Sequence, residues 1–509
     1  MAAPSQSPTV PRRRGVELAL LIFAVLLVTA ADAIVDATIN DRISSDVLTY
    51  GAGFALIYAV AHVAVRWLAP YTDPVILPAV ALLNGLGLVL IRRLDLAEAE
   101  NARRAGRAVE AGDAGVQVVW TCLGLALFVV VLLVVRDHRA LARYAYTLAA
   151  AGLAFLALPA LLPGRFSEVN GAKIWIRVAG FSIQPGEFAK LALLSFFAYY
   201  LVRKREVLSL ASKRILGIDF PRGRDLGPVL VVWLLSLMVL VFEKDLGTSL
   251  LYFGMFVVTL YIATERSSWL IIGLLLFFGG AFLAWSLGAT VHGPFASFAQ
   301  RVDVWLDPFA DADDTGYQLV QSLLGLGTGG LFGAGPGNGL PYLEGANRYV
   351  LPEVHNDFVF AGIGEEIGLF GLTALLVAYL LFIERGLRTA VTVRDSFGKL
   401  LAGGLAFTLG LQVFVIIGGV SGLIPLTGQT TPFLSAGGSS LMANWLLLAL
   451  LVRISDAARR PATLGSVGGT IAPPPTTAPP TTAPPTTAPD SARKPTEPHE
   501  APTERGAST

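Results

Sequence analysis

Long apolar runs are the feature that most limits what this 509-residue chain can fold into. Runs of roughly 18 to 22 apolar residues alternate with short charged segments, as in helical membrane proteins. Only helices and closed barrels satisfy their backbone polar groups in hydrocarbon, and these runs are too long and too uniformly apolar for barrel strands. Only 15% of the residues are charged, against about 25% in a soluble domain. The sequence therefore predicts an all-α protein that crosses the membrane many times.

Twelve membrane-spanning helices are predicted from these runs. They are expected at residues 16–37, 47–67, 73–91, 115–135, 141–162, 187–203, 226–243, 246–264, 268–288, 357–384, 398–420 and 437–453. The first apolar run follows three arginines, as the apolar region of a signal peptide does, but it is longer than the apolar region of an ordinary signal peptide. We therefore expect it to be retained as a helix.

The distribution of Lys and Arg between the loops predicts the orientation. Segment 203–225 carries seven Lys or Arg residues and segment 163–186 carries three, so the first is placed in the cytoplasm. Both termini are then cytoplasmic, and segments 92–114, 163–186, 289–356 and 421–436 are extracytoplasmic. Segment 92–114 conflicts mildly with this placement because it holds five arginines.

Two segments differ from the alternating pattern. Segment 289–356 is about 68 residues long, and loops of that length are usually functional, so we expect short helices along the membrane interface within it. Residues 456–509 contain three repeats of TTAPP type and no apolar periodicity, which predicts a disordered cytoplasmic tail. The single cysteine, Cys122, excludes an intrachain disulfide, and there is no Cys/His cluster typical of a structural metal site.

Ionisable residues at the edge of a span are candidates for function because they are costly in a membrane. His355 and Asp357 lie where a polar segment enters a long apolar run. A partly desolvated carboxylate has a raised pKa, which suits a general base. Alternatively, Asn356 or Asp357 caps the helix.

Glu365 and Glu366 lie about two turns deeper in the same run. They must face protein or water rather than lipid. Their predicted role is structural or in lining a cavity, and packing against a polar partner is as consistent with the sequence as direct chemistry.

A second candidate segment begins another span. Glu187 and Lys190 are three residues apart and share one helix face. They form either an internal ion pair or, with Arg177, an anion site in which Glu187 orients the lysine. Trp175 is either an interfacial anchor or a platform for a sugar ring.

Two further segments bring polar residues to predicted span ends. Residues 242–248, which include Asp245, form a charged turn that is either a solvated hairpin or part of a site. Residues 425–440 are rich in Gly, Ser, Thr and Pro, and irregular backbone at membrane depth is tolerated only in a protein-lined or wet cavity. Gly437 and Gly438 serve either that cavity or close helix packing.

The glycines of 327–337 do not form a phosphate loop, because no strand precedes them and no Gly-Lys-Ser/Thr follows.

Together these segments resemble the SEDS family (shape, elongation, division and sporulation), and most closely its elongation members. The matching pieces are NGAKIWI, QPGEFAK, EKDLGTS, GYQLVQS, LPEVHNDFVFAGIGEE and PLTGQTTPFLSAGGSS, which occur in family order over roughly residues 72–455. The family core has ten spans. The resemblance therefore implies a catalytic membrane domain at 72–455 and two additional helices at 16–71.

The resemblance implies a glycosyltransferase that polymerises lipid II at the outer surface of the membrane. The growing glycan, which is linked to undecaprenyl diphosphate, is its other implied substrate. Its implied partners are a class B penicillin-binding protein and membrane lipid, with no nucleic acid. The essential aspartate of the family motif falls on Asp357, which is therefore the expected general base. The important Trp, Glu and Lys fall on Trp175, Glu187 and Lys190. The other expected substrate-binding residues are Arg177, Glu353, His355, Gln318, Gln321, Ser435, Gly437, Gly438 and Ser439.

Lys190 and Arg177 are expected to stabilise the leaving diphosphate, and a divalent cation, Mg²⁺ or Mn²⁺, is a further candidate with no ligands assigned. Four positions depart from the family pattern: Asn356 replaces Thr, Ala436 replaces Tyr, Lys244 replaces a common Pro, and Thr427 stands where division members tend to have Lys. The last favours an elongation member over a division polymerase. A lipid II flippase and a non-catalytic scaffold are the remaining alternatives.

Overall fold

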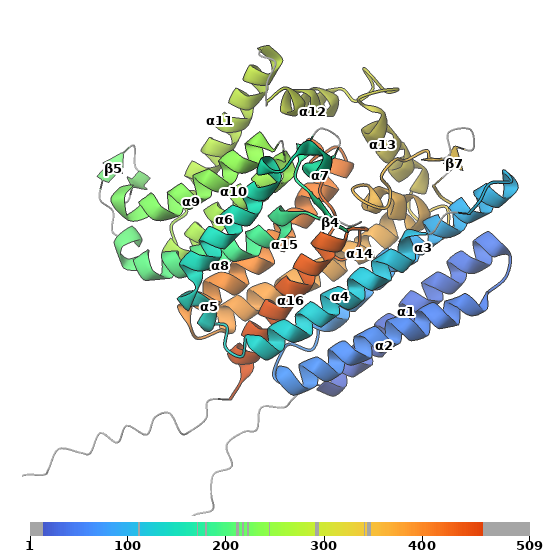
Figure 1. Cartoon of the computed structure of the whole chain (residues 1–509), viewed down its shortest axis with the longest axis horizontal. Coiled ribbons are helices and arrows are strands. Elements are labelled where there is room, and N and C mark those ends of the chain that lie inside the picture. The colour runs from blue at the N-terminus through green and yellow to red at the C-terminus, as the bar shows by residue number, and fades with distance from the viewer. Residues whose placement is uncertain are drawn as a thin grey trace, which may run out of the picture. The chain divides into compact units, whose positions relative to one another are not determined.

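The protein is a bundle of helices in the computed structural model (Figure 1). The described residues are 14–109, 112–169, 172–178, 181–209, 213–215, 218–220, 223–243, 245–290, 295–340, 342–343 and 348–461. Lys244 and the Pro/Thr-rich repeats lie outside them, so the predictions made there are not addressed.

Each of the twelve predicted spans coincides with a helix. These helices are α1 (Arg14–Asn40), α2 (Ser45–Leu68), α3 (Ile76–Arg104), α4 (Asp113–Val134), α6 (Ala145–Leu161), α8 (Pro185–Ser209), α9 (Gly223–Phe242), α10 (Leu246–Thr264), α11 (Ser268–Thr290), α14 (Val359–Thr392), α15 (Ser396–Val420) and α16 (Gly438–Arg459). Within the described residues, nine are long and apolar enough to cross a membrane. The exceptions are α6 and α9, whose apolar parts are shorter, and α8, which is less apolar. The all-α membrane fold predicted from the sequence is confirmed.

Short elements occupy the connections. The long segment before α14 contains the predicted short helices, α12 (Ala296–Leu306) and α13 (Tyr317–Gly329). Two single turns, α5 (Ala140–Arg143) and α7 (Gly164–Ser167), follow α4 and α6. Four antiparallel hairpins were not predicted: β1 (Glu168–Val169) with β2 (Ala172–Lys173), β3 (Ile176–Val178) with β4 (Phe181–Ile183), β5 (Lys213–Ile215) with β6 (Ile218–Phe220), and β7 (Tyr342–Leu343) with β8 (Arg348–Tyr349).

The beginning of α1 and the end of α16 meet at one end of the bundle. Arg14 donates to the carbonyl of Thr72, and the Thr72 hydroxyl donates to the carbonyl of Val452 at 2.8 Å. Arg459 pairs with Asp73 at 2.6 Å. The two ends therefore lie on the same side, as an even number of spans requires.

The last helix continues further than the sequence predicted. Asp456 is buried in α16 and accepts a hydrogen bond from the backbone N–H of Tyr71 at 2.8 Å. Residues 456–459 therefore belong to the bundle, and assigning them to the tail was wrong. The helix continues because the carboxylate of Asp456 finds a buried donor in the neighbouring turn.

The arginines of segment 92–114 are partly helical rather than in a loop. Helix α3 includes Arg92 and Arg93, and both side chains are buried. Arg92 pairs with Asp32 of α1, and Arg93 pairs with Glu366 of α14 at 2.6 Å. Charges that are paired inside the protein are not loop charges in the sense of the orientation rule. The conflict found in the sequence is therefore reduced to the exposed arginines beyond this point.

Helix α14 is broken at Gly368, where φ is +63°. The N–H groups of Leu369 and Phe370 donate to the carbonyls of Gly330 and Leu331 instead of to their own helix. A Cβ on Gly368 would lie 2.4 Å from the backbone nitrogen of Gly333, so only glycine fits this crossing. Segment 330–339 thus accepts the backbone hydrogen bonds that the broken helix cannot make within itself. Irregular backbone at membrane depth is tolerated only when its polar groups are paired in this way.

We expect Arg93→Ala to destabilise the protein by about 3–5 kcal/mol, since it leaves the buried Glu366 carboxylate without its cation. The measurement is the thermal unfolding midpoint of the purified protein in detergent. Arg104→Ala is the matched control on the same helix, because the Arg104–Glu100 pair is exposed and is worth at most about 1 kcal/mol. Equal midpoints for the two variants would contradict the structural role of Glu366.

Candidate active site

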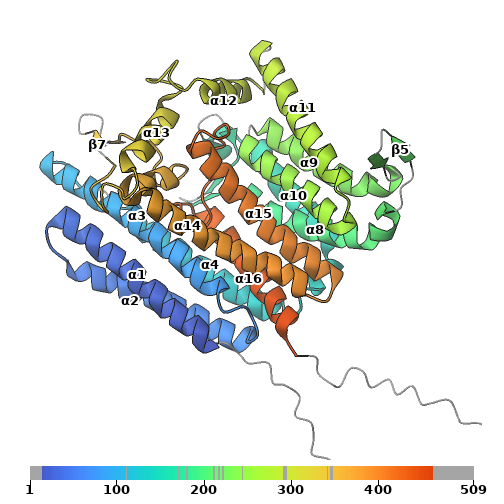
Figure 2. The ribbon, with the colours of Figure 1, turned by 180° about the vertical axis from the view of Figure 1, so that it is seen from behind.

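The segment between α15 and α16, two helices labelled in Figure 2, joins the parts of the site through its hydrogen bonds. The Ser435 hydroxyl donates to the carbonyl of Asn356 at 2.6 Å, and the N–H of Ala436 donates to the carbonyl of His355 at 2.7 Å. Gln117 of α4 donates to the carbonyl of Ser435 at 3.1 Å. The predicted Gly/Ser/Thr-rich segment therefore holds the turn before α14 in place.

Asp357 lies in that turn and does not cap the helix. The N-cap position of α14 is Phe358, which has no side-chain cap. Among the described residues, no donor lies within hydrogen-bonding distance of the Asp357 carboxylate. A Cβ on Gly428 would lie 3.5 Å from Asp357 Oδ2, so an exposed glycine borders the carboxylate. The capping alternative is excluded, and the carboxylate is left open to a ligand.

The surroundings of Asp357 tune it as a base. Burial and, to a smaller extent, the charge of the Glu353 carboxylate raise the pKa of Asp357 to about 6. The charges of Arg301 and His355 act in the opposite direction. At neutral pH the carboxylate is mostly ionised, yet it is more basic than an ordinary aspartate.

Arg301 of α12 is a site residue that the sequence analysis missed. Its Nη1 donates to the carbonyls of Leu426 and Thr427 at 3.4 and 3.2 Å. Its positive charge lowers the pKa values of both Asp357 and Asp245, so it lies within electrostatic reach of both carboxylates. Burial lowers the pKa of Arg301 itself, but a guanidinium stays protonated at neutral pH. One signal was available: Arg301 is the only Lys or Arg between Arg266 and Arg348.

The turn between α9 and α10 is buried rather than solvated. Asp245 caps α10 by accepting the N–H of Thr248 on Oδ1 at 2.9 Å, and the Gln429 amide donates to the same oxygen at 3.4 Å. Burial raises the pKa of Asp245. Burial and the neighbouring Asp245 raise the pKa of Glu243 to about 8, so Glu243 is protonated at neutral pH. The solvated-hairpin alternative is wrong because both carboxyl groups are buried and Asp245 accepts a hydrogen bond from Gln429 of the Gly/Ser/Thr-rich segment.

Lys190 is held inside the protein. Its Nζ lies 2.7 Å from Glu187 Oε2 and 3.0 Å from Gln412 Oε1, and its side chain is 2% exposed. The amide of Gln412 in turn donates to the carbonyl of Thr430 at 3.0 Å. This geometry favours the ion-pair alternative, in which Glu187 and Lys190 connect α8 to α15 and to the segment above it.

Four further predicted residues are half-buried or exposed. Trp175 is half-buried between β2 and β3, and Arg177 is exposed on β3. Gln318 and Gln321 are half-buried on α13. The structure gives none of these four a contact with Asp357.

The start of α16 ties β4 to the site. The Ser439 hydroxyl accepts the N–H of Gln184 at 3.1 Å. A Cβ on Gly438 would lie 2.2 Å from the Trp120 ring, so Gly438 serves close packing. Gly437 has φ of +156° and its N–H donates to Gln117 at 3.3 Å. These glycines shape the wall rather than supply chemistry.

The residues do not offer an evident metal site. Within the part of the chain that the structure describes, no group of three or more His, Cys, Asp or Glu side chains is arranged to hold an ion. Asp357, Glu353 and His355 influence one another electrostatically without forming such a group. No step of the reaction below is therefore assigned to a metal.

The fold and this cluster define a multi-pass membrane protein with a carboxylate-centred site at one end of the bundle. Residues 74–460 match the sequence model of a family described as cell cycle protein, which is named after FtsW, RodA and SpoVE. The chain belongs to this family. The match begins after α2, so it leaves α1 and α2 outside the shared core.

Related proteins support this membership. The chain is 52% identical to the peptidoglycan glycosyltransferases RodA of Mycobacterium bovis and Mycobacterium tuberculosis, over 89% of this chain and 93% of theirs. It is 35% identical to a probable peptidoglycan glycosyltransferase FtsW of a Geobacter species, over 61% of this chain and 78% of that one.

Solved structures agree in fold. The chain resembles one from a study of a peptidoglycan synthase complex that coordinates polymerization and crosslinking, with a TM-score of 0.57 and 26% identity over 77% of this chain and 99% of that one. It also resembles Thermus thermophilus RodA, with a TM-score of 0.51 and 26% identity over 78% of this chain and 100% of that one.

Proposed function

We propose that this chain polymerises lipid II into glycan strands at the outer face of the plasma membrane, for cell elongation. It is a peptidoglycan glycosyltransferase, as its 52%-identical relatives are. The observation that carries the mechanism is the Asp357 carboxylate, which is partly buried, has no hydrogen-bond partner among the described residues, and is bordered by an exposed glycine. Such a group is free to accept a proton from a hydroxyl that enters the site.

In the proposed reaction, Asp357 accepts the proton of the 4-hydroxyl group of the acceptor lipid II sugar. That oxygen forms a bond to the anomeric carbon of the growing glycan. The bond between this carbon and undecaprenyl diphosphate breaks, and the diphosphate leaves with the electron pair. A single displacement inverts the anomeric centre and needs no protein nucleophile, so one carboxylate suffices.

The leaving diphosphate needs positive charge, and Arg301 is the cation best placed to supply it. Lys190 is already neutralised by Glu187. Arg301 donates to the carbonyls of Leu426 and Thr427 through a single nitrogen, Nη1. Its positive charge acts on the Asp357 carboxylate, whose pKa it lowers. A fixed cation in a partly dry site stabilises developing negative charge more than it would in water. We therefore assign to Arg301 the role that the sequence had suggested for Lys190 and Arg177.

The flippase alternative is disfavoured by where the charges lie. Asp357, Arg301 and Asp245 occupy the segments that connect helices at one end of the bundle, not the middle of spans. Transporters commonly bind substrate near the midplane. Purified protein in detergent, where no membrane sides exist, should convert lipid II into polymer; a flippase would leave lipid II unchanged.

The orientation proposed here places Asp357 outside and both termini in the cytoplasm. An Asp313→Cys substitution in a Cys122→Ala background tests it, since Asp313 is exposed between α12 and α13. A membrane-impermeant maleimide added to intact cells should label this cysteine. Labelling only after lysis would place the site in the cytosol and overturn the proposal.

We also propose a class B penicillin-binding protein as partner, which would crosslink the strands made here. The similarity to a chain from a peptidoglycan synthase complex supports this. Co-purification of a transpeptidase with the tagged full-length chain is the expected result. A polymerase recovered without any such protein would count against the partner but not against the reaction.

The pH dependence of kcat/KM, obtained at lipid II concentrations well below KM, follows from the pKa of Asp357 in the free protein, which is about 6. The base is active when ionised, so kcat/KM should fall about tenfold per pH unit below that value and level off above neutrality. The measurement is the initial rate of lipid II consumption between pH 5 and 8. A flat profile would show that proton transfer to this carboxylate does not limit the reaction.

A further inference from the structure

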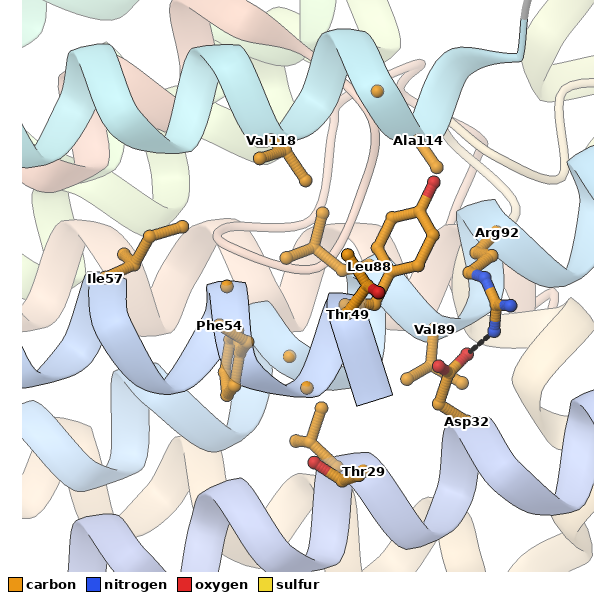
Figure 3. Close-up of a pocket in the computed structure, with 16 residues that line it drawn as sticks. Thr29, Asp32, Thr49, Phe54, Ile57, Leu88, Val89, Arg92, Ala114 and Val118 are labelled. Carbon is orange, nitrogen blue, oxygen red and sulfur yellow. Dashed lines mark hydrogen bonds and ion pairs between the residues drawn. The ribbon is translucent and has the colours of Figure 1, made fainter. Parts of the chain in front are cut away.

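A pocket outside the catalytic site lies between the two N-terminal helices and the core. It has a volume of about 250 Å³ and is lined by α1, α2, α3 and the start of α4 (Figure 3). Most of its wall is apolar, including Val28, Phe54, Ile57, Leu88 and Val118. It is smaller than the roughly 300–1,000 Å³ of a pocket that encloses a whole ligand. Its size fits part of a hydrocarbon chain.

One end of this pocket carries charge. Asp32 and Arg92 lie in the wall and form an ion pair, and Tyr50 lies beneath the Arg92 guanidinium at 4.7 Å. Asp36 also faces Arg92 at 3.4 Å. Two carboxylates and one guanidinium leave this end with one unbalanced negative charge.

The two carboxylates differ in how far they are satisfied. Asp36 accepts hydrogen bonds from Asn40 at 2.9 Å and from the N–H of Ser44 at 2.5 Å. Asp32 is 4% exposed, and its Oδ2 has no hydrogen-bond partner among the residues that the structure describes. A buried carboxylate oxygen that accepts no hydrogen bond costs free energy. A ligand that brings a hydrogen-bond donor to Asp32 Oδ2 would therefore be stabilised in this pocket.

We propose that this pocket binds a membrane lipid with an ethanolamine headgroup, one acyl chain filling the apolar part and the ammonium donating to Asp32. The ammonium balances the excess negative charge and supplies the missing donor. The lipid phosphate then lies on the side of Arg92 and Tyr50. Tyr50 and Ala114, which line the same pocket, lie five residues and one residue after the first residues of α2 and α4, within about 8 Å of those helix ends, which corresponds to the headgroup boundary.

Defined lipids test the headgroup. The full-length protein is purified in detergent and exposed to dioleoyl phosphatidylethanolamine, phosphatidylcholine or phosphatidylglycerol, and bound lipid is counted by native mass spectrometry. Phosphatidylcholine carries the same charge without an N–H donor, and phosphatidylglycerol carries no ammonium. We expect phosphatidylethanolamine to bind about tenfold more tightly than either, as a hydrogen bond to a charged group allows. Equal binding of the three lipids would overturn the headgroup assignment.

Glycine substitutions test the pocket. Gly53 and Gly115 line it, and a Cβ on either would meet no atom within 4 Å, so the new side chains of Gly53→Leu and Gly115→Leu start in open space. Gly279→Leu on α11 is the matched control, since its added Cβ also meets open space but lies outside the pocket. The two pocket variants should lose the bound lipid about tenfold, and the control should retain it. Unchanged lipid in all three variants would overturn the site.

Asp32→Asn tests whether the charge of Asp32, rather than the shape of the cavity, selects the headgroup. The variant should still hold a chain but no longer distinguish phosphatidylethanolamine from phosphatidylcholine. If this variant misfolds because Arg92 loses a partner, the two glycine variants still decide the question. Retained discrimination in a folded Asp32→Asn protein would show that this carboxylate does not contact the headgroup.

Discussion

Asp357→Asn should reduce glycan polymerisation by at least about 10²–10⁴-fold, the usual contribution of a general base. The amide keeps the size of the side chain but cannot accept the hydroxyl proton. Two other buried carboxylates are already engaged, since Asp245 caps α10 and Glu187 is paired with Lys190. The measurement is a gel of the glycan products that the purified variant makes from lipid II.

The same variant should not unfold more easily. Because burial raises the pKa of Asp357 from 3.8 to about 6, ionising it at neutral pH costs the folded protein about 3 kcal/mol. This cost grows as the pH rises from about 4 through 6, and the neutral amide avoids it. The unfolding midpoint of Asp357→Asn at pH 7 should therefore equal or exceed that of the wild type.

Asp313→Asn, an exposed change between α12 and α13, is the matched control and should leave both activity and stability unchanged. A folded Asp357→Asn protein that polymerises lipid II normally would remove the assignment of the base. A variant that is inactive because its midpoint drops would show that the aspartate holds the turn rather than the proton.

The helices could be predicted because the bilayer imposes a length and a composition on each span. Every apolar run became a helix, and only the ends differed. The predicted helix ends were wrong where buried polar contacts extend a helix. Asp456 extends α16 in this way, and the paired Arg92 and Arg93 extend α3. Such partners are distant in sequence, so no local pattern reveals them.

The candidate site was predictable in its segments but not in its contacts. The polar residues at span ends marked the turn of Asp357 and the segment 425–440, because charge at a membrane boundary is unusual. The sequence left open whether Lys190 pairs with Glu187, and it could not show the contact between Lys190 and Gln412. Nor did it show Arg301, which reaches the site only because α12 folds back over the segment between α15 and α16.

Arg301→Ala should lower kcat about 10²–10³-fold, as removal of one charge-stabilising donor does in other active sites. KM should change less, since the cation matters most when the diphosphate gains charge as the bond breaks. The measurement is the rate of lipid II polymerisation over a range of substrate concentrations.

Arg301→Lys keeps the charge but loses the planar fork that reaches the carbonyls of Leu426 and Thr427. It should recover part of the rate, because electrostatic stabilisation survives while its geometry does not. Arg103→Ala, which removes an exposed arginine of α3, is the control and should be fully active. If Arg301→Ala raises KM and leaves kcat intact, the arginine only binds the precursor. If the lysine variant is as inactive as alanine while folding normally, the position of the guanidinium outweighs its charge, and the diphosphate must contact it through paired hydrogen bonds.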